Sequence, residues 1–213
     1  TSSSGGVENH ALFDTLRGAT KGLSSNVTAA EVTDANSLTS FNSNGFSLGT
    51  GYTNFATNLN NYTYSSWSFR KAPGFFDVVQ FTTSNSTNQR ISHSLGSIPG
   101  MIIIKNLVSA DNWLVYHRET GRNKWTDLSN TDGTVTSSNI WGTADPTSTD
   151  FGFNSAGWLG NNSYNFIAYV FAGGESTAAT ARSLKFDNDV DALEIASSSD
   201  FGPGTGDFTW EAW

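Results

Sequence analysis

The segment NWLVYHRETG at residues 112–121 repeats the pattern of NHALFDTLRG at residues 9–18. Further landmarks recur in the same order: Ser25-Asn26 and Ser129-Asn130, Asn44-Gly45-Phe46 and Phe151-Gly152-Phe153, and residues 62–69 and 164–171. The offset between matched positions stays between 102 and 107 residues. A catalytic site is normally built once, whereas duplicated units build extended bodies or repeated binding surfaces. The repeat therefore favours a structural or adhesive protein.

Most of the remaining pattern predicts strands. Short runs of β-branched and aromatic residues, bounded by Gly, Pro, Asn and Asp, lie at residues 76–82, 100–106, 113–117 and 166–171. Trp67 and Trp113 both fall in segments typical of core strands. Helical periodicity is confined to residues 11–16 and 29–32, where about one or two turns are expected. Because the connections are short, we expect an all-β fold of tandem antiparallel β-sandwich units.

The composition excludes several classes of function. The chain has 213 residues, a net charge of −8 and only 11 Lys plus Arg, so it lacks the clustered cations that nucleic acid or an anionic membrane surface would require. Its longest apolar run, residues 101–104, is far shorter than the roughly 20 residues of a membrane span, which predicts no membrane insertion. Since cysteine is absent, disulfides, thiolate zinc sites and thiol nucleophiles are excluded.

The repeat divides the chain into three parts. We expect a first β unit at residues 1–72, a second at residues 73–174, and a linker leading into a third domain at residues 175–213. The second unit has predicted strands ahead of the repeated region, but only eight residues precede Asn9 in the first. The first unit should therefore have an unpaired sheet edge, completed by upstream sequence or by a neighbouring chain. We expect the chain to be an excerpt of a longer polypeptide or a product trimmed at both ends.

The first two units resemble a repeat domain of tail-fibre-like virion proteins of marine tailed phages, cyanophages especially. The resemblance is carried by residues 9–18, 38–49 (LTSFNSNGFSLG), 91–106 (ISHSLGSIPGMIIIKN), 113–117, 146–149 and 164–172. It implies a protein of the virion surface, with other virion proteins as neighbours and a homotrimer as the expected assembly.

The third part resembles the opening of a laminin-G-like, concanavalin A-type jelly roll. Residues 183–187 and 192–195 are similar to its first hairpin, and residues 201–213 to the next strand. Such domains often bind glycans, although a fold alone does not establish a ligand.

The candidate glycan-binding residues are the tryptophans in turn-rich parts of the second unit, Trp125, Trp141 and Trp158. Exposed indole rings stack on the apolar faces of sugars, but indoles also form the core of small β-sandwiches. The core or an interface is the alternative for all three.

The acidic run of Asp187, Asp189 and Asp191 is the candidate calcium site, because calcium takes six to eight oxygen ligands. The alternative is a hairpin turn, which Asp and Asn favour. Apart from this calcium ion, we expect no cofactor. None of the three histidines has ligand spacing, and the acid pairs of Glu119 with Asp127 or Asp145 have no counterparts in the first unit, so we expect no enzyme.

These observations predict a virion protein, a tail fibre, spike or capsid-surface fibre, that displays β domains for multivalent adhesion to host-surface polysaccharide. A capsid decoration or cement protein and the non-catalytic part of a glycan depolymerase are the alternatives.

Overall fold

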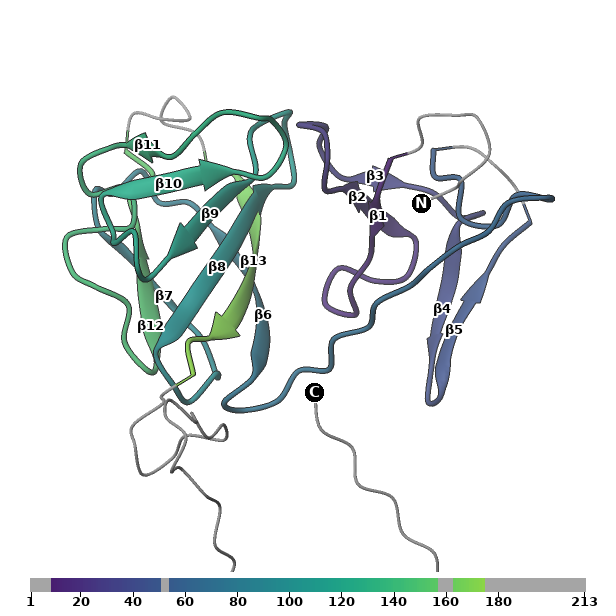
Figure 1. Ribbon diagram of the computed structural model, residues 1–213, viewed down its shortest axis with the longest axis horizontal. Helices are drawn as coiled ribbons and strands as arrows, with labels where there is room; N and C mark the ends of the chain where they lie inside the picture. The colour runs from purple at the N-terminus through teal and green to yellow at the C-terminus, as the bar shows by residue number, and fades with distance from the viewer. Residues whose placement is uncertain (1–8, 51–53, 157–162, 175–213) are drawn as a thin grey trace, which may run out of the picture. The chain divides into compact units, whose positions relative to one another are not determined.

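The computed structural model describes residues 9–50, 54–156 and 163–174, and within them the fold is all-β (Figure 1). The described residues belong to one compact unit. The described residues contain no helix, so none of them forms a membrane-spanning helix. The strands are β1 (Ala11–Leu12), β2 (Lys21–Ser24), β3 (Val32–Thr33), β4 (Leu38–Asn42), β5 (Gly45–Leu48), β6 (Phe76–Thr82), β7 (Gln89–Ser92), β8 (Pro99–Asn106), β9 (Leu114–His117), β10 (Lys124–Asp127), β11 (Val135–Thr136), β12 (Asp150–Phe153) and β13 (Asn165–Ala172).

A six-stranded antiparallel sheet organises the second repeat, in the order β11-β10-β9-β8-β13-β6. The strands predicted at residues 76–82, 100–106, 113–117 and 166–171 are confirmed, within one residue at either end, as β6, β8, β9 and β13. The long central strands β8 and β13 are apolar on both faces, since alternate side chains enter two different clusters. The sheet therefore has a layer on each side.

One face packs against the two-stranded sheet β12-β7 to form a sandwich. Phe166, Ala168 and Val170 of β13 lie in this cluster with Phe151 and Phe153 of β12. Edge-to-face and stacked ring contacts, such as Phe81 with Phe151 and Phe166, fix the packing. This β-sandwich-like arrangement is the one that the alternating strands predict.

The other face holds Ile167 and Tyr169 of β13 and contacts the first repeat. Leu23 of β2 is fully buried in a cluster with Trp113, Ile167 and Tyr169. The Trp113 indole lies outside β9 but is fully buried, as predicted for a core residue, and its Nε1 donates to the carbonyl of Ser24. The first repeat thus shares a core with the second.

The three-stranded sheet β1-β2-β3 has the same backbone pairing as β9-β10-β11. Ala11↔Ser24 and Leu12↔Leu23 recur, each 103 residues later, as Leu114↔Asp127 and Val115↔Thr126. Lys21↔Thr33 and Gly22↔Val32 recur at the same spacing as Lys124↔Thr136 and Trp125↔Val135. The turns agree as well: Gly18 and Gly121 both have positive φ, and each donates to the carbonyl four residues earlier. The sequence repeat therefore extends to backbone register.

The first repeat departs from the second where β13 should recur. Residues 62–69 match β13 in sequence but form no strand, and Trp67 is 89% exposed, so its prediction as a core-strand residue is wrong. A strand of this kind needs neighbours, and β13 pairs with both β6 and β8. The predicted helical turns are also wrong: residues 11–16 begin with β1, and residues 29–32 lead into β3.

Candidate functional site

The predicted tryptophans do not form a common surface. Trp141 is fully buried, makes an edge-to-face contact with Tyr116 and donates from Nε1 to the carbonyl of Lys124. Its ring is part of the core, so the alternative to glycan contact holds for this residue. Trp158 lies outside the described residues.

Trp125 is half-buried against the sandwich core. Its counterpart in the first repeat is Gly22, where a Cβ would overlap the ring of Phe55. Phe55 is itself buried and packs on Phe13 at 5.4 Å between ring centroids. The space of the indole is thus filled by a different ring in the first repeat, which indicates that Trp125 contributes to packing.

The most exposed large aromatic side chains of the described residues lie instead at the joint between the repeats. Trp67, Phe69 and Phe75, called here the aromatic surface, are 89%, 54% and 51% exposed. The ring of Phe69 contacts Phe75 at 6.4 Å and Phe171 at 5.7 Å, the latter edge-on. Large exposed apolar side chains that gather on one support mark interaction sites.

Phe69 and Phe75 are held by the second repeat. Phe76 of β6 contacts both rings and stacks parallel to Tyr169, which anchors Phe69 and Phe75 to the large sheet. A signal for this surface is present in the sequence, because residues 62–69 match β13. Among its described residues, the first repeat has no strands that match the partners of β13, so aromatic side chains suited to a core remain exposed.

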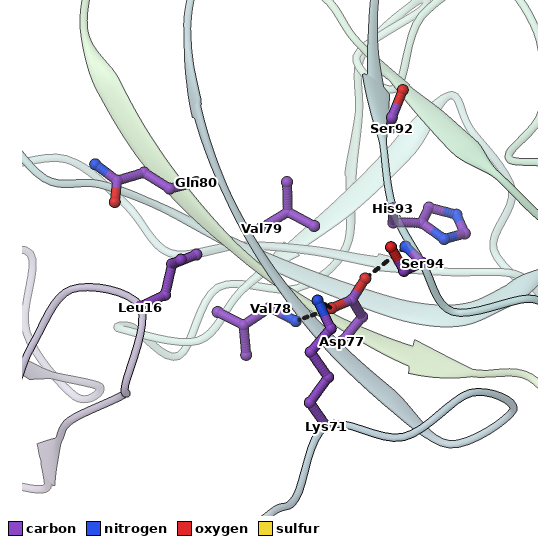
Figure 2. Close-up of a pocket in the computed structure, with 9 residues that line it drawn as sticks. All are labelled: Leu16, Lys71, Asp77, Val78, Val79, Gln80, Ser92, His93 and Ser94. Carbon is purple, nitrogen blue, oxygen red and sulfur yellow. Dashed lines mark hydrogen bonds and ion pairs between the residues drawn. The ribbon is translucent and has the colours of Figure 1, made fainter. Parts of the chain in front are cut away.

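A shallow groove of about 310 Å³ runs along the free edge of β6 (Figure 2). Lys71, Asp77, Gln80, Ser92 and Ser94 give it a polar lining. Leu16, Val78, Val79 and His93 complete the lining. The groove begins two residues after Phe69, so the aromatic surface and the polar groove are joined by a short piece of chain.

Asp77 is the charged centre of the groove. Figure 2 shows Lys71 and the backbone of Ser94 meeting its carboxylate, at 2.6 Å each. Burial alone would raise the pKa of Asp77, but the hydrogen bonds from Lys71, Ser94 and Val78 outweigh it and lower that pKa. The carboxylate is therefore ionised at neutral pH and orders the groove, and it has no proton to donate to a substrate.

His93 faces away from that carboxylate in Figure 2 and stacks on Phe151. Its Nδ1 accepts a hydrogen bond from the backbone of Leu95. Burial lowers the pKa of His93 and outweighs the opposing influence of the Thr147 carbonyl and of the Asp77 and Asp150 charges. A neutral imidazole in this position holds the turn that follows β7.

A buried polar cluster joins the two repeats. The Arg17 side chain is only 1% exposed and pairs with Asp14 at 2.5 Å and Glu31 at 3.2 Å. The hydroxyl of Tyr169 donates to Asp14 at 2.7 Å and accepts from Arg17 at 3.4 Å. Burial raises the pKa of Tyr169 well above its usual value, so the hydroxyl keeps its proton.

Lys105 forms a second buried link. It is fully buried, and its Nζ donates to the carbonyls of Thr28 and Asp111 at 2.8 and 2.7 Å. Burial lowers the pKa of Lys105 to about 8, against the charges of Asp111 and Asp127, which raise it. Because Lys105 is fully buried and its ammonium is bonded to two backbone carbonyls, this arrangement offers no open position for a substrate.

The remaining candidates give no site in the described part of the chain. Asp187, Asp189 and Asp191 lie outside it, and no group of three or more His, Asp or Glu side chains within it could hold a metal ion. Of the acid pairs, Asp127 is buried and accepts hydrogen bonds from Ser129 and Asn130, whereas Glu119 is exposed and contacts Arg118.

Comparison with known proteins identifies a family for this chain. Neither a curated protein nor a solved structure is significantly similar to this chain. The family described as a domain of unknown function (DUF7483) matches residues 2–180, a range that contains all thirteen strands of the described residues. The chain belongs to the DUF7483 family.

Proposed function

We propose that this chain is a non-enzymatic structural protein of a phage virion, and that the aromatic surface contacts host-surface glycan. The observation that carries the proposal is the exposure of Trp67, Phe69 and Phe75, of which Phe69 and Phe75 lie against Phe76 of the large sheet. Rigid aromatic rings bury much area at little entropic cost, and the apolar faces of sugar rings fit against them.

The polar groove supports the same proposal. Gln80, Ser92 and Ser94 are exposed side chains that can donate and accept hydrogen bonds in the groove, which begins at Lys71, two residues after Phe69. A sugar ring offers both an apolar face and a rim of hydroxyls, and the aromatic surface and the polar groove match these two properties. A single such contact is weak, so adhesion would depend on several copies in one assembly, with the homotrimer as the expected form.

The resemblance of the repeats to tail-fibre-like virion proteins supports the location, with other virion proteins as neighbours. The net charge of −8 argues against a nucleic acid or anionic membrane partner. A capsid cement protein would need the same rigid sheets but no glycan contact.

The test is binding of the purified protein to host cells and to a glycan array, compared with the variants Trp67→Ala and Phe69→Ala. Val108→Ala is the matched control, because Val108 is an exposed apolar residue outside the aromatic surface. We expect both aromatic variants to lose at least about tenfold in affinity while the control binds normally.

Three outcomes would count against the proposal. Absence of binding by the unaltered protein would favour a cement role, and equal binding by all variants would exclude the aromatic surface. Release of reducing sugar ends from host polysaccharide would overturn the assignment as a non-enzyme.

A further inference from the structure

We propose that the open edge of β1 binds an extended apolar strand with the residue pattern of β8, supplied by a different protein. The proposal rests on the internal repeat and is independent of glycan binding. It concerns how the first repeat is completed.

The second repeat shows what covers this edge. Successive residues of an antiparallel strand direct their backbone groups to opposite neighbours. The Trp113 carbonyl accepts from Leu128, just after β10, and the Arg118 N–H donates to Gly100, next to Met101 of β8. Leu114 and Tyr116 of β9 therefore direct their backbone groups toward β8. The matching positions 103 residues earlier are Ala11 and Phe13. The His10 carbonyl accepts from the N–H of Ser25, which follows β2. Because direction alternates along a strand, the N–H and C=O groups of Ala11 and Phe13 point to the opposite side, away from β2.

No described residue bonds those backbone groups. β1 is an outer strand of its three-stranded sheet, with β2 as its one neighbour in the part of the structure described. A row of unpaired N–H and C=O groups is a template for another strand. A second sign comes from residues 62–69: in the second repeat their counterpart β13 also pairs with β8, and here they form no strand.

The chemistry of the partner follows from β8. Its core, Ile102, Ile103 and Ile104, is β-branched and enters apolar clusters on both faces of the sheet. A partner strand for β1 should therefore be apolar on both faces, run antiparallel to β1, and place successive backbone bonds opposite Ala11 and Phe13.

The test uses a labelled synthetic peptide with the sequence of residues 98–107 (IPGMIIIKNL) and a lysine tail for solubility, added to the full chain. Fluorescence anisotropy measures binding, and hydrogen exchange reports protection at Ala11 and Phe13. Two N-methylated peptides distinguish binding through one edge of the peptide strand from binding through the other. In β8 the N–H of Ile104 faces Leu114 of β9, whereas that of Ile103 faces Tyr169 of β13.

Methylation at Ile104 should weaken binding at least about tenfold, and methylation at Ile103 should leave it unchanged. On the protein side, Ala11→Pro removes an N–H that makes no bond within the sheet, and it should weaken binding to the same degree. Ala11→Val keeps that N–H and is the control that should bind normally.

Circular dichroism of Ala11→Pro checks that it folds, and the methylated peptides keep the test decisive if it does not. Binding that ignores the Ile104 methyl group, or protection that appears at Leu114 instead of Ala11, would overturn the proposal. So would self-association of the chain through β1 without any peptide, because the occupant would then be a second copy.

Discussion

The hydroxyl of Tyr169, on the central strand of the large sheet, donates a 2.7 Å hydrogen bond to Asp14 of the first repeat. The same carboxylate pairs with the buried guanidinium of Arg17, so three side chains from two repeats satisfy one another. A buried polar group that loses its partner carries a desolvation cost, which makes this contact a sensitive link between the repeats.

Tyr169→Phe should lower the free energy of unfolding by about 1–3 kcal/mol, because Asp14 and Arg17 lose a buried partner. Tyr116→Phe is the matched control: its ring is 4% exposed against 6% for Tyr169, and its hydroxyl has no hydrogen bond to the described residues. Urea titration followed by fluorescence measures both. Equal losses would show that the cost comes from the ring environment and not from the link.

Lys105 predicts a pH dependence in the alkaline range. Its pKa is about 8 in the folded chain against 10.5 for an ordinary lysine. Between these values the unfolded chain holds more protons, so stability should rise with pH, by at most about 1.4 kcal/mol per pH unit.

The measurement is urea unfolding at steps from pH 8 to about 9.5, below the range in which tyrosines ionise in the unfolded chain. Lys105→Met should abolish the rise, whereas Lys124→Met, at an exposed position, should retain it. A rise that persists in Lys105→Met would assign the effect to another group.

Two glycines at matching positions should respond differently to substitution. A Cβ at Gly152 would lie 2.5 Å from the carbonyl oxygen of Trp141, whereas at Gly45 it would meet nothing within 4 Å. Gly152→Ala should therefore destabilise the fold by about 1–3 kcal/mol, and Gly45→Ala by less than about 0.5 kcal/mol. Thermal unfolding of the two variants checks this, and similar losses would contradict the close approach.

Removal of a buried and of an exposed tryptophan should have different effects on the free energy of unfolding. Trp141→Ala removes a fully buried ring and should cost about 3–5 kcal/mol, whereas Trp67→Ala, at 89% exposure, should change stability by less than about 0.5 kcal/mol. Chemical denaturation distinguishes them. A large loss in Trp67→Ala would mean that its ring is covered in solution.

The strands that local pattern could predict are those with apolar residues on both faces. β6, β8, β9 and β13 are recognisable because their runs are β-branched or aromatic and end at turn residues. The repeat also predicts that β1 and β9 are equivalent, although β1 is too short to recognise from its own residues.

The features that could not be predicted depend on contacts far along the chain. Trp141 and Trp67 both lie in stretches rich in Ser and Asn, and only tertiary packing buries one and exposes the other. Lys105 ends an apolar run and has the appearance of a solvated strand end. Its burial depends on carbonyls at Thr28 and Asp111, whose approach no local pattern indicates.

The shared cluster of Leu23, Trp113 and Tyr169 means that this duplication has not produced two autonomous modules. Leu23, Leu38 and Phe55 are the buried apolar side chains of the first repeat in the described chain, and one of the three lies against the second repeat. Melting should accordingly proceed as a single cooperative step. Cutting the polypeptide at the joint would leave an amino-terminal fragment with too little interior to persist alone.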